Sequence, residues 1–416
     1  MKKFDIAIIG GGASGLAAAI AAARKGAAVA IFERNRVTGK KLSLTGNGKC
    51  NLTNANCTKN NWDTLKHAYF SDSPDFAKNV IDAFDATDTL DFFSSIGLFT
   101  KLKAGIYYPL SEQASAVSGI LRLACEEYSV VVHTDYMVNE ISVSPNKYRF
   151  EINKGEYAAR RLIIAAGGSA LPKSGSDGAG FSLAKMLGHK IIPPGPALTG
   201  LKCSGANFHD MGGVRTDAKL FLVIDGKIEK EEFGNLQITE CGLSGIPVFQ
   251  LSRHAVRALE KNRTVQMRID FLPEKDGKEL KLAMRKMVSN CPQRTILQHL
   301  LGLFSKKLAQ AIVFGCGFRI DRILAYEDIA AVTDKIKNFT VDVIEANGFD
   351  NAQVTCGGID TRKIDSSTME SRLISGLYFA GEIIDTDGIC GGYNLQFAWA
   401  TGHLAGSSAA ESLKKA

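Results

Sequence analysis

The sequence contains no Cys-x-x-Cys pair, no long run of basic side chains and no apolar stretch of membrane-spanning length. Its nine cysteines are odd in number and scattered, which favours reduced thiols over a disulfide framework. The longest apolar stretch, near residues 16–23, is far shorter than the roughly 20 residues that a spanning helix needs. The seven histidines show no spacing typical of a metal site. We therefore expect a cytoplasmic protein with no metal and no membrane partner.

Charge of both signs is present and nearly balanced. The chain has 50 Lys and Arg against 43 Asp and Glu, a formal net charge of +7. The basic residues occur as scattered pairs such as Lys40-Lys41 and Lys306-Lys307, which favours a solvated surface over a track for nucleic acid. We therefore expect a small-molecule substrate and no nucleic-acid partner. At 416 residues the chain exceeds one compact core, so we expect two or three domains.

The first 33 residues predict a β-α-β unit with a nucleotide-binding turn. Buried strands are expected at 4–9 and 29–32, with an alanine-rich helix at 15–25 between them. Gly10, Gly12 and Gly15 form G-x-G-x-x-G between the first strand and the helix. The first glycine permits a tight turn, the second lets a pyrophosphate approach, and the third lets the helix pack on the strand. Glu33 ends the second strand, where a carboxylate accepts hydrogen bonds from an adenosine ribose.

The far end of the chain favours FAD over NAD as the dinucleotide. A strand is expected at 377–380, followed directly by Gly381 and Glu382. A helix expected over 395–413 opens with Gly391-Gly392-Tyr393-Asn394-Leu395, and its N–H groups could face the flavin edge that gains negative charge on reduction. An ordinary glycine-capped helix start is the alternative for this stretch. We expect non-covalent FAD, and NAD(P)H only as a transient co-substrate because the sequence has one dinucleotide fingerprint.

Two further segments resemble a known family. The loop 39–54 reads Gly-Lys-Lys-Leu-Ser-Leu-Thr-Gly-Asn-Gly-Lys-Cys-Asn-Leu-Thr-Asn, which is similar to the Thr-Gly-x-Gly-[Lys/Arg]-Cys-Asn loop of the BaiN/YhiN-like flavoproteins. The segment 376–396 is similar to the closing signature of the same family. These proteins are also known as aminoacetone-oxidase-like or NAD(P)/FAD-dependent oxidoreductases. The resemblance covers essentially the whole chain.

The resemblance implies an α/β fold with a Rossmann-type, glutathione-reductase-like FAD-binding domain formed by both chain ends. An inserted β-barrel-like domain would carry a small helical subdomain. The expected limits are 1–190 and 355–416 for the FAD-binding domain, 191–273 and 318–354 for the β-rich insert, and 274–317 for the helical subdomain. Three prolines between 193 and 196 predict a linker after residue 191.

The fingerprint and the resemblance together imply which residues line the cofactor. They come from the glycine turn, the end of the second strand, the loop 39–54, later strand ends and the last helix: Gly10, Gly12, Ala13, Ser14, Gly15, Glu33, Arg34, Lys40, Lys41, Thr45, Gly46, Gly48, Cys50, Asn51, Val138, Ala166, Gly167, Gly381, Glu382, Asp385, Gly392, Tyr393, Asn394 and Leu395.

The resemblance also implies an FAD-dependent oxidoreductase that moves two electrons between flavin and a small organic substrate. Both NAD(P)H as donor to an unsaturated or steroid-like carbon substrate and dioxygen as acceptor in an amine oxidase stay open. The alternatives from other classes are a flavoprotein acting on tRNA and a flavin-binding sensor without turnover. No catalytic residue beyond the flavin is assigned. Cys50 is expected to contact the flavin without a redox partner, because Cys57 does not give the C-x4-C spacing of dithiol flavin reductases.

Overall fold

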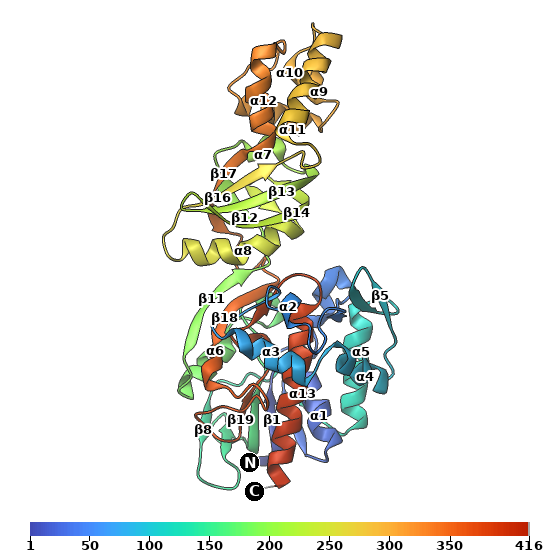
Figure 1. Ribbon diagram of the computed structural model, residues 1–416. Coiled ribbons are helices and arrows are strands. Elements are labelled where there is room, and N and C mark those ends of the chain that lie inside the picture. Colours follow the sequence, from blue (N-terminus) through green and yellow to red (C-terminus); the bar gives the residue numbers. More distant parts are fainter. Residues whose placement is uncertain (415–416) are drawn as a thin grey trace. The chain divides into compact units, whose positions relative to one another are not determined.

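The computed structural model describes residues 1–414, apart from the side chain of Pro74, and divides the chain into two compact units (Figure 1). Unit 1 contains residues 1–195 and 354–416, so both ends of the chain build it. Unit 2 contains residues 196–353. Each unit has its own hydrophobic core, as expected for a chain of this length.

The centre of unit 1 is a seven-stranded sheet. Its strands follow the order β7 (Val131–His133), β2 (Val29–Phe32), β1 (Lys2–Ile9), β10 (Tyr157–Ile164), β9 (Phe150–Ile152) and β8 (Ile141–Val143), and β19 (Leu377–Phe379) also pairs with β10. The pairs β7–β2, β2–β1, β1–β10 and β10–β19 are parallel, whereas β8, β9 and β10 form an antiparallel meander. Strands β2 and β19 are fully buried runs without a charged residue, and β1 and β10 each end in a buried apolar run, as expected for strands that are covered on both faces.

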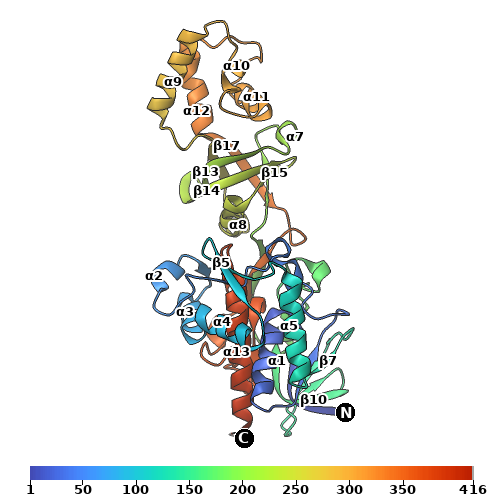
Figure 2. The ribbon, with the colours of Figure 1, turned by 90° about the vertical axis from the view of Figure 1, so that its right-hand side faces the viewer.

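Helices α1 (Ala13–Arg24) and α13 (Tyr393–Lys414) lie side by side in unit 1 (Figures 1 and 2). Glycines on α13 make this close approach possible. A Cβ atom on Gly402 would lie 2.4 Å from the carbonyl oxygen of Ser14, and one on Gly406 would lie 2.1 Å from that of Ala18. The last helix of the chain is thereby fixed against the first, which brings both chain ends to one place.

The rest of unit 1 consists of short elements that link the sheet strands. Between β2 and β7 the chain forms the 3-10 helix η1 (Leu42–Gly48), β3 (Thr53–Asn54), α2 (Trp62–Leu65), β4 (Tyr69–Phe70), α3 (Pro74–Ala83), α4 (Ala86–Ser95), β5 (Thr100–Lys103), β6 (Ile106–Pro109) and α5 (Ala114–Glu127). After β10 come η2 (Pro172–Ser174), α6 (Ala179–Met186), β11 (Ile191–Ala197) and, beyond unit 2, β18 (Val354–Ile359), η4 (Thr361–Lys363), η5 (Gly381–Ile383) and β20 (Asp387–Gly388).

Unit 2 is built on a closed six-stranded barrel. The strands follow the order β12 (Leu201–Ser204), β15 (Gly242–Ser244), β14 (Lys227–Thr239), β13 (Arg215–Ile224), β16 (Val265–Asp270) and β17 (Phe339–Ala346). Buried and partly exposed residues alternate along β13, so that every second side chain fills the barrel interior. Helices α7 (Phe208–Met211) and α8 (Ile246–Leu259) complete this part.

A group of helices interrupts the barrel between β16 and β17. It comprises α9 (Gly277–Asn290), α10 (Ile296–Leu300), α11 (Lys306–Gly315), η3 (Tyr326–Asp328) and α12 (Ile329–Lys337). Capping boxes start two of these helices: Asp276 with Glu279 at α9, and Thr295 with Gln298 at α10. The side chains thus bind the free N–H groups that each helix start leaves.

The predicted fold class is confirmed: a Rossmann-type sheet and a closed barrel are both present. The segment after residue 191, expected to be a linker, is strand β11, which pairs with β18, and the border between the two units falls within it. Proline holds an extended backbone and lacks only an N–H, so a two-stranded ribbon accepts it at its edge. Helix α12 was not foreseen, and α13 begins two residues earlier than expected. The domain limits given above stay a prediction.

Candidate functional site

The turn after β1 contains two glycines that the surrounding backbone requires, Gly10 and Gly15, and one that it does not require, Gly12. Gly10 has φ +101, and a Cβ there would lie 2.5 Å from the carbonyl oxygen of Ala165. A Cβ on Gly15 would lie 1.9 Å from the carbonyl oxygen of Gly10. Gly12 is extended (φ −80, ψ −165), and a Cβ there would meet no atom within 4 Å. Open space therefore faces Gly12 at the N-terminus of α1, which fits a bound pyrophosphate.

The start of α1 is joined to the C-terminal segment. The hydroxyl of Ser14 donates to the carbonyl oxygen of Ala380 over 3.3 Å, and a Cβ on Gly381 would lie 2.4 Å from Ser14 Oγ. The N–H of Gly381 donates to Thr401 Oγ1 over 2.9 Å. Ser14, which follows Ala13 at the start of α1, is thus brought against Gly381, although more than 360 residues separate them in the sequence.

Glu33 is held firmly at the end of β2. Its side chain is 7% exposed, and Oε2 accepts the N–H of Gly11 over 2.8 Å. Oε1 accepts the backbone N–H of Asn35 over 2.8 Å and its side-chain amide over 2.7 Å. The loop that contains buried Val138 is tied to the same place, because the N–H of Tyr136 donates to the carbonyl oxygen of Glu33. These bonds aim the carboxylate while leaving acceptor capacity on its oxygens.

The three basic residues that were predicted to line the cofactor have protein partners. Arg34 forms an ion pair of 2.6 Å with Asp177. Lys40 donates to the carbonyl oxygen of Lys173 over 2.6 Å. Lys41 pairs with Glu382 over 2.6 Å. Each lysine is thereby fixed to a later segment of unit 1, and none extends freely into solvent.

Glu382 joins three segments through its two carboxylate oxygens. Besides the bond of Oε2 to Lys41, Oε1 accepts the N–H of Thr355 over 2.8 Å. The side chain of Thr355 in turn accepts the N–H groups of Ser169 and Ala170. The turn at Ala166 and Gly167, where Gly167 has φ +75, therefore lies in the same network as the end of β19.

The loop from Thr45 to Asn51 is the most contorted part of the predicted site. Gly46 (φ 58), Asn47 (φ 53), Gly48 (φ 81) and Cys50 (φ 60) all have left-handed backbones. The N–H of Cys50 donates to the carbonyl oxygen of Thr45 over 3.0 Å, which closes the loop. A Cβ on Gly46 would lie 2.6 Å from Asn51 Oδ1. Left-handed Asn47 and Cys50 are costly conformations, and such strain concentrates at functional sites.

Cys50 lies completely buried inside this loop. Burial raises the pKa of its thiol to about 12, and burial likewise raises the pKa of Cys57 to about 12. Cys57 contacts Tyr69 Oη over 3.7 Å. None of the nine cysteines forms a disulfide bond within the described residues. A thiol with so high a pKa stays protonated at neutral pH and is a poor nucleophile.

The first residues of α13 meet the segment that follows the loop. A Cβ on Gly392 would lie 2.7 Å from the backbone of Thr53, so only glycine fits. The side chain of Asn394 accepts the N–H of Gly388 and donates to its carbonyl oxygen, each over 2.8 Å. Tyr393 stacks edge-on against Tyr69, and Leu395 packs at the edge of the core. Asp385 lies nearby in sequence, 1% exposed, and accepts the N–H of Asp72 over 3.3 Å.

The sequence interpretation missed several residues that shape this site. Asn35 orients Glu33, and Thr355 connects Glu382 to the turn after β10. Gln396 is fully buried. Its side-chain oxygen accepts hydrogen bonds from the hydroxyls of Thr53 (2.6 Å) and Thr89 (2.9 Å), and its side-chain nitrogen donates to the carbonyl oxygen of Phe84. Asn35 lies only two residues from Glu33, whereas the partners of Thr355 and Gln396 lie far away along the chain, so that only tertiary contacts reveal the roles of these two. Gly11, whose N–H binds Glu33, was also missed, although its position inside the glycine fingerprint could have indicated it.

Two general properties follow from the described residues. No helix between residues 1 and 414 combines the length and the apolar character needed to traverse a bilayer. In the same part of the chain, no three His, Cys, Asp or Glu side chains gather as a metal ion would require.

A nucleotide turn on a parallel sheet, completed by a strand and helix from the far end of the chain, is the arrangement of Rossmann-type FAD-binding oxidoreductases. The class of the protein is therefore a flavoprotein oxidoreductase. Sequence comparison agrees: the chain belongs to the family described as HI0933-like protein Rossmann domain, whose model matches residues 4–408. The BaiN/YhiN-like resemblance is thereby confirmed.

Relatives and solved structures support this membership. The 3-dehydro-bile acid delta(4,6)-reductase of Clostridium scindens is 41% identical to this chain and covers 98% of it and 99% of its own length. A ribosomal RNA dihydrouridine synthase of Haemophilus influenzae is 29% identical and covers 95% and 96%. A solved 3-ketosteroid delta1-dehydrogenase of Sterolibacterium denitrificans has a TM-score of 0.53 at 12% identity, over 99% of this chain and 100% of that one. This last likeness concerns the fold alone.

Proposed function

We propose that this protein saturates a carbon–carbon double bond conjugated to a carbonyl group in a steroid-like small molecule. The observation that carries the proposal is the 41% identity, over almost the full length of both chains, to a 3-dehydro-bile acid delta(4,6)-reductase. That name specifies a 3-oxo steroid acid with double bonds at positions 4 and 6. Conjugation to the 3-oxo group makes such an alkene electrophilic, so it accepts a hydride.

The predicted cofactor residues would hold FAD in two groups. The open space at Gly12 would receive the pyrophosphate, and the fixed carboxylate of Glu33 would accept the ribose hydroxyls. The loop around Cys50 and the start of α13 at Gly392 would contact the flavin and its ribityl chain. The N-terminal end of α13 would stabilise negative charge at the flavin. The bound flavin supplies hydride chemistry, while these residues position it and exclude water.

We propose NAD(P)H as the electron donor. Gly10, Gly12 and Gly15 form the one G-x-G-x-x-G fingerprint of the sequence, so the nicotinamide would visit the flavin instead of occupying its own dinucleotide domain. Dioxygen as an acceptor, in the manner of an amine oxidase, is the competing route. The two routes differ in what reoxidises the reduced protein.

Anaerobic half-reactions test this proposal. NADH or NADPH should bleach the flavin absorbance, and a 3-oxo-4,6-diene steroid acid should then restore it. The matched saturated 3-oxo steroid should not restore it, since it has no conjugated alkene. Restoration by dioxygen together with bleaching by primary amines would instead identify an oxidase and would reject the reductase.

Action on RNA is a second candidate function. Full-length relatives at 29% and 26% identity are ribosomal RNA dihydrouridine synthases of Haemophilus influenzae and Escherichia coli. The formation of dihydrouridine also saturates a carbon–carbon double bond that is conjugated to a carbonyl group, here in the uracil ring. The same flavin chemistry would therefore serve both substrates. Reoxidation of the reduced protein by a uridine-containing RNA, but not by the steroid acid, would favour this candidate.

A further inference from the structure

One segment of unit 2 has an excess of positive charge, although its basic residues do not form a continuous run in the sequence. Residues 280–320 contain seven Lys and Arg and no Asp or Glu. This equals the net charge of the whole chain, +7, so the rest of the sequence is balanced. We call residues 280–320 the acid-free segment; it covers most of α9 and all of α10 and α11.

The cations of the acid-free segment are exposed, and most are unpaired. Lys281, Arg285, Lys286, Arg294 and Lys306 are all exposed, and none of them has an ion pair within residues 1–414. Lys281 and Arg285 stand four residues apart on α9 and therefore share one face of that helix. Like charges on one face repel each other. A binding partner that carries several negative charges would relieve this repulsion.

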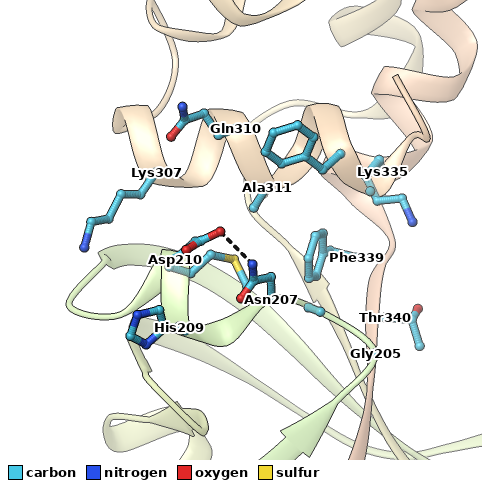
Figure 3. A pocket seen from close by; sticks show the side chains of 14 residues that line it. Gly205, Asn207, His209, Asp210, Lys307, Gln310, Ala311, Lys335, Phe339 and Thr340 are labelled. Atoms are coloured by element: carbon cyan, nitrogen blue, oxygen red, sulfur yellow. Dashed lines mark hydrogen bonds between the residues drawn. The ribbon is translucent and has the colours of Figure 1, made fainter. Parts of the chain in front are cut away.

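A cavity of about 740 Å³ lies beside this segment, within unit 2 (Figure 3). Helix α11 forms one wall and the short helix α7 with its preceding loop forms another. Aromatic surface comes from Phe339 and from Phe314, which is 58% exposed. Lys307 and Lys335 add positive charge at the wall. Lys307 donates to the carbonyl oxygen of Gly212 over 2.7 Å, which fixes its position.

Amide groups give the cavity hydrogen-bonding capacity. Asn207 and Gln310 both line it, and the amide nitrogen of Asn207 donates to Asp210 over 2.6 Å. The side-chain carbonyl oxygen of Asn207 and the side-chain amide of Gln310 have no hydrogen bond within residues 1–414. Amides beside aromatic rings and lysines are the groups that bind a nucleobase by its polar edge and by its face, next to its phosphate.

From this arrangement we infer that the acid-free segment and the adjoining cavity form a binding surface for single-stranded RNA. Helix α11 belongs to both parts, because it carries the unpaired Lys306 and also the cavity residues Lys307 and Phe314. Phosphates would lie along the exposed cations, and one unstacked base would enter the cavity against Phe314. The inference deepens the second candidate function, but it concerns binding and holds whether or not RNA is reduced.

Fluorescence anisotropy of the full-length flavoprotein with a labelled, uridine-rich RNA of about 15 nucleotides tests the surface. With about five phosphate contacts, affinity should fall roughly 100-fold between about 50 and 200 mM salt. The double variant Arg285→Glu with Lys286→Glu should weaken binding at least tenfold and flatten the salt dependence. The matched control, Lys147→Glu with Lys185→Glu, reverses two exposed lysines of unit 1 and should change affinity less than about threefold.

Phe314→Leu tests the cavity separately, because it removes the ring and keeps an apolar side chain. RNA affinity should fall about tenfold, while affinity for heparin, a polyanion without bases, should not change. Flavin content and thermal unfolding establish that every variant is folded. Equal RNA affinity in the two charge-reversal variants would overturn the inference, and so would NADPH or AMP binding without RNA binding. RNA binding with no reduction of RNA would reject the second candidate function and leave this surface standing.

Discussion

At the scale of single residues, the glycine turn shows how a fold leaves room for a ligand. Gly10 and Gly15 are required by the protein itself, since a Cβ at either position would overlap backbone oxygen atoms. Gly12 has an ordinary extended backbone and open space where its side chain would be. No neighbouring atom of the chain requires glycine at this position, which fits a partner that comes from outside the chain.

This distinction predicts a specific effect of Gly12→Val. The variant should fold, because valine adopts that backbone and meets no atom of the chain. It should lose FAD affinity by at least about 100-fold, or ~2.7 kcal/mol, because the side chain would occupy the pyrophosphate position. The amount of FAD released from the purified variant measures the loss of binding, and its circular dichroism spectrum measures folding. Full FAD occupancy in the folded variant would place the pyrophosphate elsewhere.

The buried thiol of Cys50 predicts a spectator role in electron transfer. With its pKa raised to about 12 by burial, the thiol does not form a thiolate near neutral pH. Cys50→Ser should therefore retain FAD and lower turnover less than about tenfold, equal to about 1.4 kcal/mol of barrier. Anaerobic dithionite titration of the unmodified protein should consume two electrons per flavin. Uptake of four electrons would reveal a redox-active disulfide and would contradict this role.

At the scale of elements, the contact between α1 and α13 joins the two ends of the chain. The glycines of α13 bring its backbone within van der Waals distance of α1, near Ser14 and Ala18. Because α13 begins at the predicted flavin contacts, and α1 begins at the predicted phosphate site, this contact sets the spacing between them. The packing of two helices therefore decides whether both halves of one dinucleotide can be held at once.

Gly406→Ala should consequently destabilise the protein. The added Cβ would lie 2.1 Å from the carbonyl oxygen of Ala18, so the helices must move apart at a cost of roughly 2–3 kcal/mol. Gly119→Ala is the matched control, since Gly119 lies on helix α5 with no atom within 4 Å of its Cβ position. That change should be neutral or stabilise by up to about 1 kcal/mol. Urea unfolding midpoints compare the two, and equal midpoints would mean that the helix contact is loose.

At the scale of the whole molecule, the chain leaves unit 1 through β11 and returns through β18, which pair with each other. Joining Gly195 to Val354 through a short Gly-Ser turn should therefore give a folded unit 1. Because all predicted cofactor residues belong to unit 1, this shortened protein should still bind FAD in a ratio of roughly one to one. A folded product without FAD would show that unit 2 contributes to flavin binding.

Buried and partly buried histidines in both units predict a loss of stability in acid. Burial lowers the pKa of His189, His254 and His403 to about 4, below the value near 6.5 of an unfolded chain. The unfolded state then binds protons first as the pH falls, so stability is complete above about pH 6.5 and declines toward about pH 4. Urea midpoints between about pH 7.5 and 5 measure this decline. His189→Gln should reduce the decline while its amide can still bond Ser371 Oγ, the partner of His189 at 2.8 Å.

The sequence by itself determined the elements whose pattern is local. The β-α-β unit, the glycine fingerprint, the strand over 339–346 and the division into a nucleotide-binding part and a β-rich insert all follow from periodicity and from glycine spacing. The tertiary structure alone decided what depends on distant partners. Examples are the bonds of Glu382 to Lys41 and Thr355, the buried hydrogen bonds of Gln396, and the pairing of the proline-rich strand β11 with β18. Local sequence reports the backbone preference of a segment, whereas the partner of a side chain is set by how segments far apart in the chain pack together.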